Sequence, residues 1–227
     1  MNYPSVECMH GTVDNARVAA DGRLEFRLGS ESISAGRLIL ATSVRDEMPS
    51  VPGFAGRWGR SVFHCADCHG YEMNLGPIGI IAASPLAPHH ALILPDWGSP
   101  TLLLNDAYTP TEEDLASIAR RGTQIETALI ARIDGVADVV LQDGRTFSMN
   151  GLFIQPRTPL VSPIAEKLGC ALEDGPMGRF IKVDEGKATS VHNMFACGDA
   201  ARAAGNVTLA VADGAMARFG AHRASIC

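Results

Sequence analysis

Residues 77–83 read Pro-Ile-Gly-Ile-Ile-Ala-Ala, an unbroken apolar run in a chain of 227 residues. Such a run is typical of a parallel β-strand that is buried on both faces. Similar runs follow at residues 101–104 and 151–154, and residues 86–97 between the first two runs suit a helix. This alternation of strand and helix predicts an α/β unit built on a parallel sheet.

A second helix follows the run at residues 101–104. Thr109 is expected to cap it, with Pro110 at its first position and Glu112 completing a capping box. Gly122 is expected to end it. Residues 124–133 are predicted as one strand, and a hairpin around Asp143 and Gly144 comes next. With the strand at residues 151–154, the order is that of a nucleotide-binding fold.

The flanking sequence favours short strands and one long helix. Asp21-Gly22 is a hairpin signal, and apolar and charged residues alternate after it over residues 24–28. Residues 37–42 read as a strand covered on both faces. Residues 194–197 form another short apolar strand, and residues 207–221 an alanine-rich helix. The predicted fold class is therefore α/β.

Charge and composition exclude several functions. The formal net charge is −6 and no dense Lys/Arg run occurs, so nucleic acid is not an expected partner. No apolar run reaches the roughly 18 residues that a membrane helix needs. Met1-Asn2-Tyr3-Pro4 lacks the pattern of a signal peptide. We therefore expect a soluble, cytoplasmic protein whose six cysteines are reduced, catalytic or buried.

Upstream of the first apolar run, Cys65 and Cys68 stand two residues apart and His69 follows. Such a pair can close a small disulfide ring, bind a metal or remain an unused packed pair. Zinc needs further ligands, and no second Cys-x-x-Cys exists, so no metal is predicted although His64 is nearby. If the pair is redox-active, a helix N-terminus lowers a thiol pKa and His69 can accept the proton.

Other reactive side chains are interpreted as structural. Cys197 lies in an apolar strand and is expected to pack as a small core residue, and Cys227 to be a free terminal thiol. His89 and His90 are expected to form a helical surface pair rather than a metal site.

Three segments resemble one family. Residues 37–52, residues 65–70 and residues 195–216 correspond in order to the Ala-Thr segment, the redox pair and the Gly-Asp flavin segment of low-molecular-weight thioredoxin reductases. The form Cys-x-x-Cys-His-Gly-Tyr-Glu is most similar to the branch with gliotoxin- and holomycin-type dithiol oxidases. The resemblance implies a Rossmann-like three-layer domain inserted in an FAD-binding domain. The implied domains are a truncated FAD-binding segment at 1–60, an NAD(P)-binding-like domain at 61–155 and a second FAD-binding segment at 156–227.

The same resemblance implies roles for individual residues. Cys68 is the expected flavin-proximal thiol, Cys65 the thiol that exchanges with substrate, and His69 the proton acceptor. The implied FAD-binding residues are Thr42, Gly198, Asp199, Asn206 and Val207. From the residues alone, Asp199 has a second interpretation as a helix cap.

Two departures from the family pattern concern its nucleotides. The family opens with a Gly-x-Gly-x-x-Gly turn for FAD, which this sequence does not contain, so a fragment or a truncated flavin site is expected. Ala82, Ser84 and Ala87 stand where the second glycine turn belongs, and their side chains crowd a pyrophosphate. Asp106 repels the 2′-phosphate of NADPH and suits the 2′-hydroxyl of NAD. NAD(P)H use is expected to be weak or absent.

These observations predict an FAD-dependent dithiol–disulfide oxidoreductase. Its expected partner is a small-molecule or protein disulfide or dithiol, and the family resemblance implies a homodimer. The alternative is a non-catalytic or fragmentary descendant that acts as a binding module.

Overall fold

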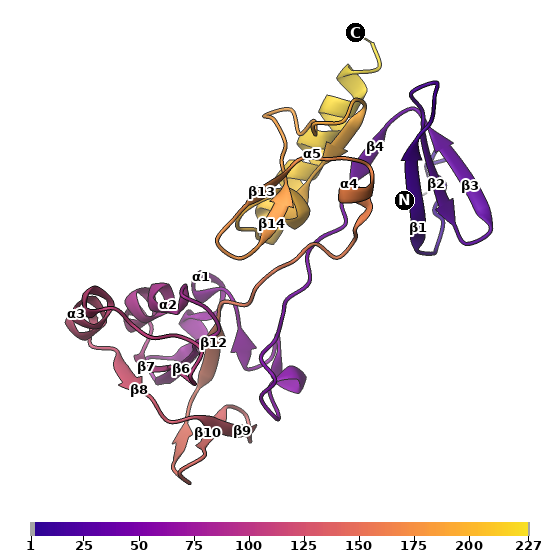
Figure 1. The fold of residues 1–227 in the computed structure, drawn as a ribbon. Coiled ribbons are helices and arrows are strands. Elements are labelled where there is room, and N and C mark those ends of the chain that lie inside the picture. The colour runs from indigo at the N-terminus through magenta and orange to yellow at the C-terminus, as the bar shows by residue number, and fades with distance from the viewer. Residues whose placement is uncertain (1–2, 227) are drawn as a thin grey trace. The chain divides into compact units, whose positions relative to one another are not determined.

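The computed structural model describes residues 3–226. The chain forms two compact units. The inserted unit is Asp46–Arg157, and the flanking unit comprises the described residues before and after it (Figure 1). One domain is thus inserted in the chain of another, as the resemblance implies.

The inserted unit is built on a five-stranded sheet. The strands lie in the order β5 (Val62–Phe63), β12 (Gly151–Ile154), β6 (Pro77–Ile81), β7 (Ser99–Leu103) and β8 (Gln124–Glu126). Every neighbouring pair is parallel. The predicted parallel sheet is therefore confirmed, and its apolar runs are its central strands.

Helices cover one face of this sheet. Ile80, Leu102 and Phe153 are buried in one cluster with residues of α2 (Ala87–Ile93) and α3 (Glu112–Arg121). Successive side chains of a strand point to opposite faces, so the next residues along these strands must be covered from the other side.

A second, antiparallel sheet provides that cover. It consists of β9 (Ile130–Asp134), β10 (Asp138–Leu141) and β11 (Thr146–Ser148), and it packs on Ile81 and Leu103. The hairpin predicted around Asp143 and Gly144 joins β10 to β11 and is confirmed. The unit has three layers, as predicted, with a sheet rather than helices as the third layer.

The single strand predicted over residues 124–133 is wrong. The segment forms β8 in the parallel sheet and β9 in the antiparallel one. The Glu126 side chain accepts a hydrogen bond from the backbone N–H of Ala128, which stabilises a turn between the two strands. Because of this turn, residues 124–133 contribute one strand to each of the two sheets.

The predicted cap of α3 is also wrong by two residues. Thr111, not Thr109, is the N-cap, and its hydroxyl accepts a hydrogen bond from the backbone N–H of Asp114 at 3.1 Å. The Asp114 carboxylate accepts in return from the backbone N–H of Thr111 at 2.8 Å. Two threonines each precede an acidic residue by three positions, and the later pair forms the capping box. Gly122 ends the helix at φ +80°, as predicted.

The flanking unit contains two small sheets. Strands β1 (Val13–Val18), β2 (Leu24–Leu28) and β3 (Glu31–Ala35) form an antiparallel sheet, which confirms the predicted hairpin between the first two. Strands β4 (Leu38–Leu40) and β15 (Met194–Ala196) pair in parallel. Parallel pairing brings the segments that follow these two strands to one edge.

Strand β4 differs from its prediction. The side chain of Ile39 is 38% exposed, so one face of the strand is not covered by the described residues.

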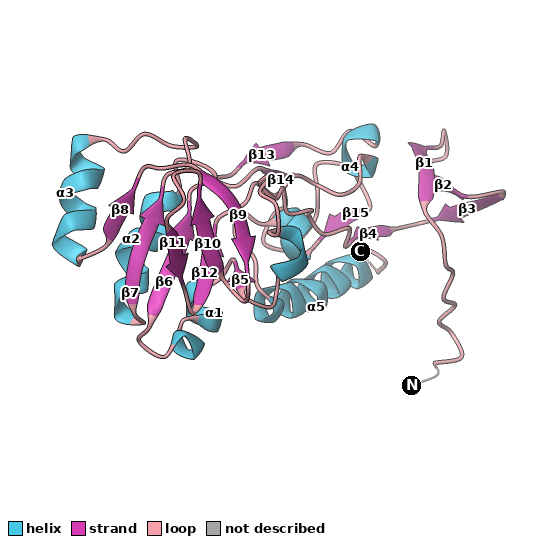
Figure 2. Cartoon of the chain, turned by 90° about the horizontal axis from the view of Figure 1, so that it is seen from below, coloured by secondary structure: helices cyan, strands magenta, loops and turns pink. Residues whose placement is uncertain are grey.

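The longest helix of the described chain, α5 (Val207–Arg223), packs on β4 and β15 and confirms the predicted helix (Figure 2). The flanking unit is completed by α4 (Ile164–Lys167), β13 (Leu172–Asp174), β14 (Arg179–Ile181) and η4 (Gly198–Ala201).

The inserted unit also contains short helices, one of which carries Cys68. They are α1 (Ala66–His69), η1 (Ala55–Arg57), η2 (Tyr71–Met73) and η3 (Leu94–Asp96). No helix in the described part of the chain has the length and apolar character to cross a bilayer.

Candidate redox and cofactor site

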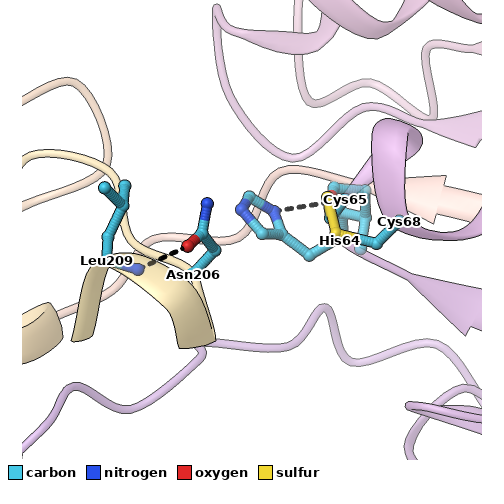
Figure 3. Close-up of a disulfide and its surroundings, with 6 residues drawn as sticks. His64, Cys65, Cys68, Asn206 and Leu209 are labelled. Atoms are coloured by element: carbon cyan, nitrogen blue, oxygen red, sulfur yellow. Dashed lines mark hydrogen bonds between the residues drawn. A yellow bond between two sulfur atoms is a disulfide. The ribbon is translucent and has the colours of Figure 1, made fainter. Parts of the chain in front are cut away.

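Cys65 and Cys68 form a disulfide directly after β5, with their Cα atoms 5.3 Å apart (Figure 3). Cys65 is the N-cap of α1, a helix of only four residues. Within the chain, Cys65 is partly buried and Cys68 is exposed. Of the three interpretations of the pair, disulfide closure is therefore the one observed. Over residues 3–226, no group of three or more His, Cys, Asp or Glu side chains is arranged to hold a metal ion.

The ring of His69 has a fixed orientation. It stacks on Phe63 with ring centroids 4.2 Å apart and planes 14° apart, and Phe63 in turn packs on Phe153. The Nδ1 atom of His69 is buried without a hydrogen-bond partner. The role of His69 as proton acceptor remains a prediction.

The parallel sheet gathers the predicted nucleotide residues at one edge. Cys65 follows β5, Ala82 and Ser84 follow β6, and Asp106 follows β7, all at the carboxyl ends of parallel strands. This is the edge at which open α/β sheets bind their ligands.

The residues at this edge do not form an open glycine cradle. Ala82 is 1% exposed, and its side chain packs among the residues under the helices. The Ser84 hydroxyl accepts a hydrogen bond from the backbone N–H of Leu86, and α2 begins without a side-chain cap. Asp106 is exposed with φ +56°. One backbone N–H of this turn, that of Leu86, is therefore already bonded within the chain.

The flanking unit brings the predicted flavin residues to the edge formed by β4 and β15. Thr42 follows β4, and Gly198 and Asp199 follow β15. Gly198 has φ +66°, a conformation that side chains disfavour. A Cβ atom on Gly205 would lie 1.9 Å from Oδ1 of Asp199, so only glycine fits under this carboxylate.

Asp199 has an unused hydrogen-bond acceptor. Its Oδ1 is buried and has no hydrogen-bond partner. Asp199 lies inside η4, whose N-cap is Cys197, and no side chain caps this short helix. A buried acceptor of this kind is costly unless a donor such as a ligand hydroxyl reaches it. The residues on this side therefore fit a hydroxyl-rich group such as the ribityl chain of FAD.

The start of α5 adds to this fit. Asn206 caps the helix by accepting a hydrogen bond from the backbone N–H of Leu209 at 2.8 Å (Figure 3). Val207 at the first position is 81% exposed. A 17-residue helix directs its positive dipole end to this point, which favours electron-rich groups.

A buried charged group on α5 ties the helix to the segments around it. Asp213 on α5 is 5% exposed and pairs with Lys187 at 2.7 Å and with Arg202 at 3.3 Å. Burial, followed by the charge of Asp213, raises the pKa of the nearby Cys197 thiol. Cys197 is 6% exposed and so behaves as the core residue that was predicted, whereas Cys227 lies outside the described residues.

Sequence patterns misplaced one histidine. His89 is exposed as predicted, but His90 is only 2% exposed and lies edge-on against Phe153, with ring centroids 6.1 Å apart. The prediction of a surface pair is wrong for His90, because α2 packs on the sheet and turns the second histidine inward.

This site and fold define a class of protein. The family model described as pyridine nucleotide-disulphide oxidoreductase matches residues 5–214, and the chain belongs to this family. Thioredoxin reductase sirT of Leptosphaeria maculans is 31% identical over 81% of this chain and 61% of its own length. Thioredoxin reductase tcpT of Claviceps purpurea is 31% identical over 95% of this chain and 71% of its length. The chain thus spans about three fifths of sirT.

Solved structures agree with this assignment. An oxidoreductase from Agrobacterium tumefaciens is 49% identical, with a TM-score of 0.92, over 99% of this chain and 76% of that one. The structure of HlmI is 28% identical, with a TM-score of 0.90, over 98% and 71%. The chain is therefore a thioredoxin reductase-like member of the family.

Proposed function

We propose that this chain acts as an FAD-dependent dithiol–disulfide oxidoreductase through Cys65 and Cys68. The observation that carries the proposal is the disulfide between them, formed at the carboxyl edge of the parallel sheet with Cys68 exposed. The buried acceptor of Asp199 and the start of α5 support FAD as the cofactor, held by Thr42, Gly198, Asp199, Asn206 and Val207.

The exchange step follows from thiol chemistry. A substrate thiolate attacks the Sγ atom of Cys65, the Cys65–Cys68 bond breaks, and Cys68 leaves as a thiolate. The second substrate thiol then attacks the mixed disulfide, which releases an oxidised substrate and the Cys65 thiolate. The substrate loses two electrons and the pair gains them, while His69 takes a substrate proton. When bound, FAD supplies two-electron exchange with the reduced pair.

The residues at the carboxyl edge of the parallel sheet suggest the direction of electron flow. Ala82 and Ser84 stand where the family pattern has glycines, the Ser84 hydroxyl is already bonded within the chain, and Asp106 repels the 2′-phosphate of NADPH. Reduction by NADPH is therefore weak or absent, and the flavin receives its electrons from a dithiol. The partner is a small-molecule or protein dithiol, and the active form is a cytoplasmic homodimer.

Flavin bleaching provides the test. The purified chain is supplied with FAD without oxygen, and dithiothreitol is added as the probe dithiol while the visible flavin absorbance is followed. Wild type is expected to bleach and Cys65→Ser to lose the reaction, whereas Cys8→Ser, which changes an exposed free thiol, retains it. A chain that binds no FAD, or a Cys65→Ser variant that bleaches at the wild-type rate, contradicts the proposal.

A second proposal is a binding module that keeps the fold without turnover. It is favoured by the residues that follow β6, where the family pattern has glycines: Ala82 is buried and the Ser84 hydroxyl is already bonded. Dithiol oxidation or disulfide reduction at a rate above that of free FAD excludes it.

A further inference from the structure

Two aromatic side chains flank the redox segment and contact each other. Phe63 is the last residue of β5, two positions before Cys65, and His69 is the last residue of α1, one position after Cys68. Their rings stack with centroids 4.2 Å apart and planes 14° apart. The stack, which we call the ring clasp, therefore joins the two ends of the segment that contains the disulfide.

One half of the ring clasp is fixed by the parallel sheet. Phe63 is 9% exposed and belongs to the core cluster under the helices. It is the register partner of Phe153 where β5 pairs with β12, and the two phenyl rings pack with centroids 5.8 Å apart. The ring of Phe63 is thus a firm surface for the imidazole of His69.

The other half of the ring clasp lies on an element with little stability of its own. Helix α1 has only four residues, and its N-cap, Cys65, makes no side-chain hydrogen bond. A helix this short does not persist without tertiary contacts, because few hydrogen bonds offset the cost of ordering it. The imidazole of His69 supplies such a contact directly after Cys68. The position of Cys68 relative to Cys65 therefore depends in part on the ring clasp.

The start of the segment has a separate contact. The Nδ1 atom of His64, the residue before Cys65, lies 3.4 Å from the backbone carbonyl oxygen of Ile154 at the end of β12 (Figure 3). This contact reaches Cys65 from the sheet and does not involve α1. The ring clasp is thus placed to act on the second cysteine rather than on the first.

We propose that Phe63 and His69 are positioning residues for the redox pair, whose ring stack brings Cys68 to Cys65 and so favours the disulfide over the free dithiol. The relevance of the ring clasp to turnover rests on the proposed function, but its effect on the thiol–disulfide equilibrium does not. Without the stack, α1 has more freedom in the reduced protein, and fewer of its conformations place the two thiols close together. Disulfide formation is then less favourable.

The test measures this equilibrium in the full chain without FAD. The protein is incubated at a series of ratios of reduced to oxidised glutathione, free thiols are alkylated, and the oxidised fraction of Cys65–Cys68 is read by mass spectrometry. Oxidised glutathione takes up the two electrons and two thiol protons of the pair and becomes two molecules of reduced glutathione. Phe63→Leu removes one ring of the clasp and is expected to lower the equilibrium constant for disulfide formation about fivefold, or about 20 mV.

Two variants of His69 separate ring stacking from the chemistry of the imidazole. His69→Phe keeps a flat ring that can stack on Phe63, and it is expected to stay within about twofold of wild type. His69→Leu is equally apolar and uncharged but cannot stack, so it is expected to shift as Phe63→Leu does. Both variants lose the proton chemistry of histidine, so a difference between them reports the stack alone.

Phe153→Leu is the matched control for core packing. It removes a ring of the same size from the same buried cluster, and the ring contacts of Phe153 are with Phe63 and His90. It is expected to leave the equilibrium within about twofold of wild type, although it lowers the stability of the fold. Equal shifts for Phe63→Leu and Phe153→Leu assign the effect to packing and overturn the proposal.

The remaining outcomes are distinct from those of the flavin experiment. Equal equilibria for His69→Phe and His69→Leu overturn the proposal, and this pair decides if Phe63→Leu does not fold, because His69 is only partly buried. A chain that fails to bleach FAD but shows the expected ordering retains the ring clasp and loses only the proposed function. A chain that bleaches FAD but gives equal equilibria for the two His69 variants retains the proposed function and loses the ring clasp.

Discussion

At the scale of single residues, the redox segment is placed by close packing against Trp97. A Cβ atom on Gly70 would lie 2.5 Å from the indole ring of Trp97 and 2.7 Å from the backbone oxygen of Ala66. The φ angle of Gly70 is −64°, which any residue adopts, so lack of space alone requires glycine here. The glycine of Cys-x-x-Cys-His-Gly therefore lets α1 lie directly on the core of the inserted unit.

Gly70→Ala is expected to destabilise the protein by about 1–3 kcal/mol, because the added methyl must push apart a backbone carbonyl and the partly buried ring of Trp97. Urea unfolding of the oxidised protein, followed by tryptophan fluorescence, measures the change. Gly56→Ala is the matched control, since nothing lies within 4 Å of a Cβ atom built there. Equal stabilities for the two variants contradict the steric explanation.

At the scale of elements, α3 illustrates how a local signal can be shifted. Thr109 and Thr111 are each followed three residues later by an acid, and only the second pair forms the reciprocal bonds. The hydroxyl of Tyr108 also donates to the Asp114 carboxylate. That third bond favours the later cap, and it involves a residue that lies before both candidates in the chain.

Thr111→Ala is expected to lower the free energy of unfolding by about 1 kcal/mol, the usual cost of losing an N-cap side chain. Thr109→Ala is expected to have little effect, although the sequence alone predicts the reverse. Thermal and urea denaturation of the two variants side by side provide the comparison. A larger loss for Thr109→Ala refutes the assignment of the cap.

The same cap has a pH dependence with a definite sign. Hydrogen bonds from the Thr111 side chain, then from Tyr108, lower the pKa of Asp114 from its ordinary value of 3.8. A carboxyl whose pKa is lower in the folded state stabilises the fold above its unfolded pKa, and this contribution disappears as pH falls through the folded value.

Asp114→Asn is therefore expected to be less stable than wild type at neutral pH. The difference is expected to shrink once the pH falls below 3.8 and to vanish when Asp114 is protonated in the folded protein. Urea midpoints measured for both proteins across this range give the result. A difference that stays constant with pH excludes the carboxylate as its source.

At the scale of the whole molecule, the inserted unit contains its own cores. Both clusters around its parallel sheet, one under the helices and one under the antiparallel sheet, are built from residues of Asp46–Arg157 alone. Near the ends of this segment, the backbone N–H of Glu47 donates to the carbonyl of Arg157 at 2.8 Å, so the two ends meet. A segment with its own core and adjacent ends meets the conditions for independent folding.

Residues 46–157 expressed alone are expected to unfold cooperatively in urea and to retain the Cys65–Cys68 disulfide. Circular dichroism and a thiol assay under non-reducing conditions test both points. The excised segment carrying Gly70→Ala serves as a destabilised reference. A non-cooperative transition contradicts the independence of the unit.

Much of this architecture was predictable because its signals are local. Residues 77–83, 101–104 and 151–154 are rich in apolar side chains, and such runs become the buried centre of a parallel sheet. The split of residues 124–133 was not predictable, because both halves are compatible with strand and only the sheets they join distinguish them. The burial of His90 was missed because α2 is too short to show a clear apolar face.

The amino-acid sequence by itself determined the family, the parallel sheet and the Cys-x-x-Cys pair, since these depend on residue types at short spacing. Only the tertiary structure buried the ring of His90 beside that of His64 and left the Oδ1 atom of Asp199 buried without a partner. Both facts depend on how separate elements pack, because the cost of burying a polar atom is set by neighbours that are distant along the chain.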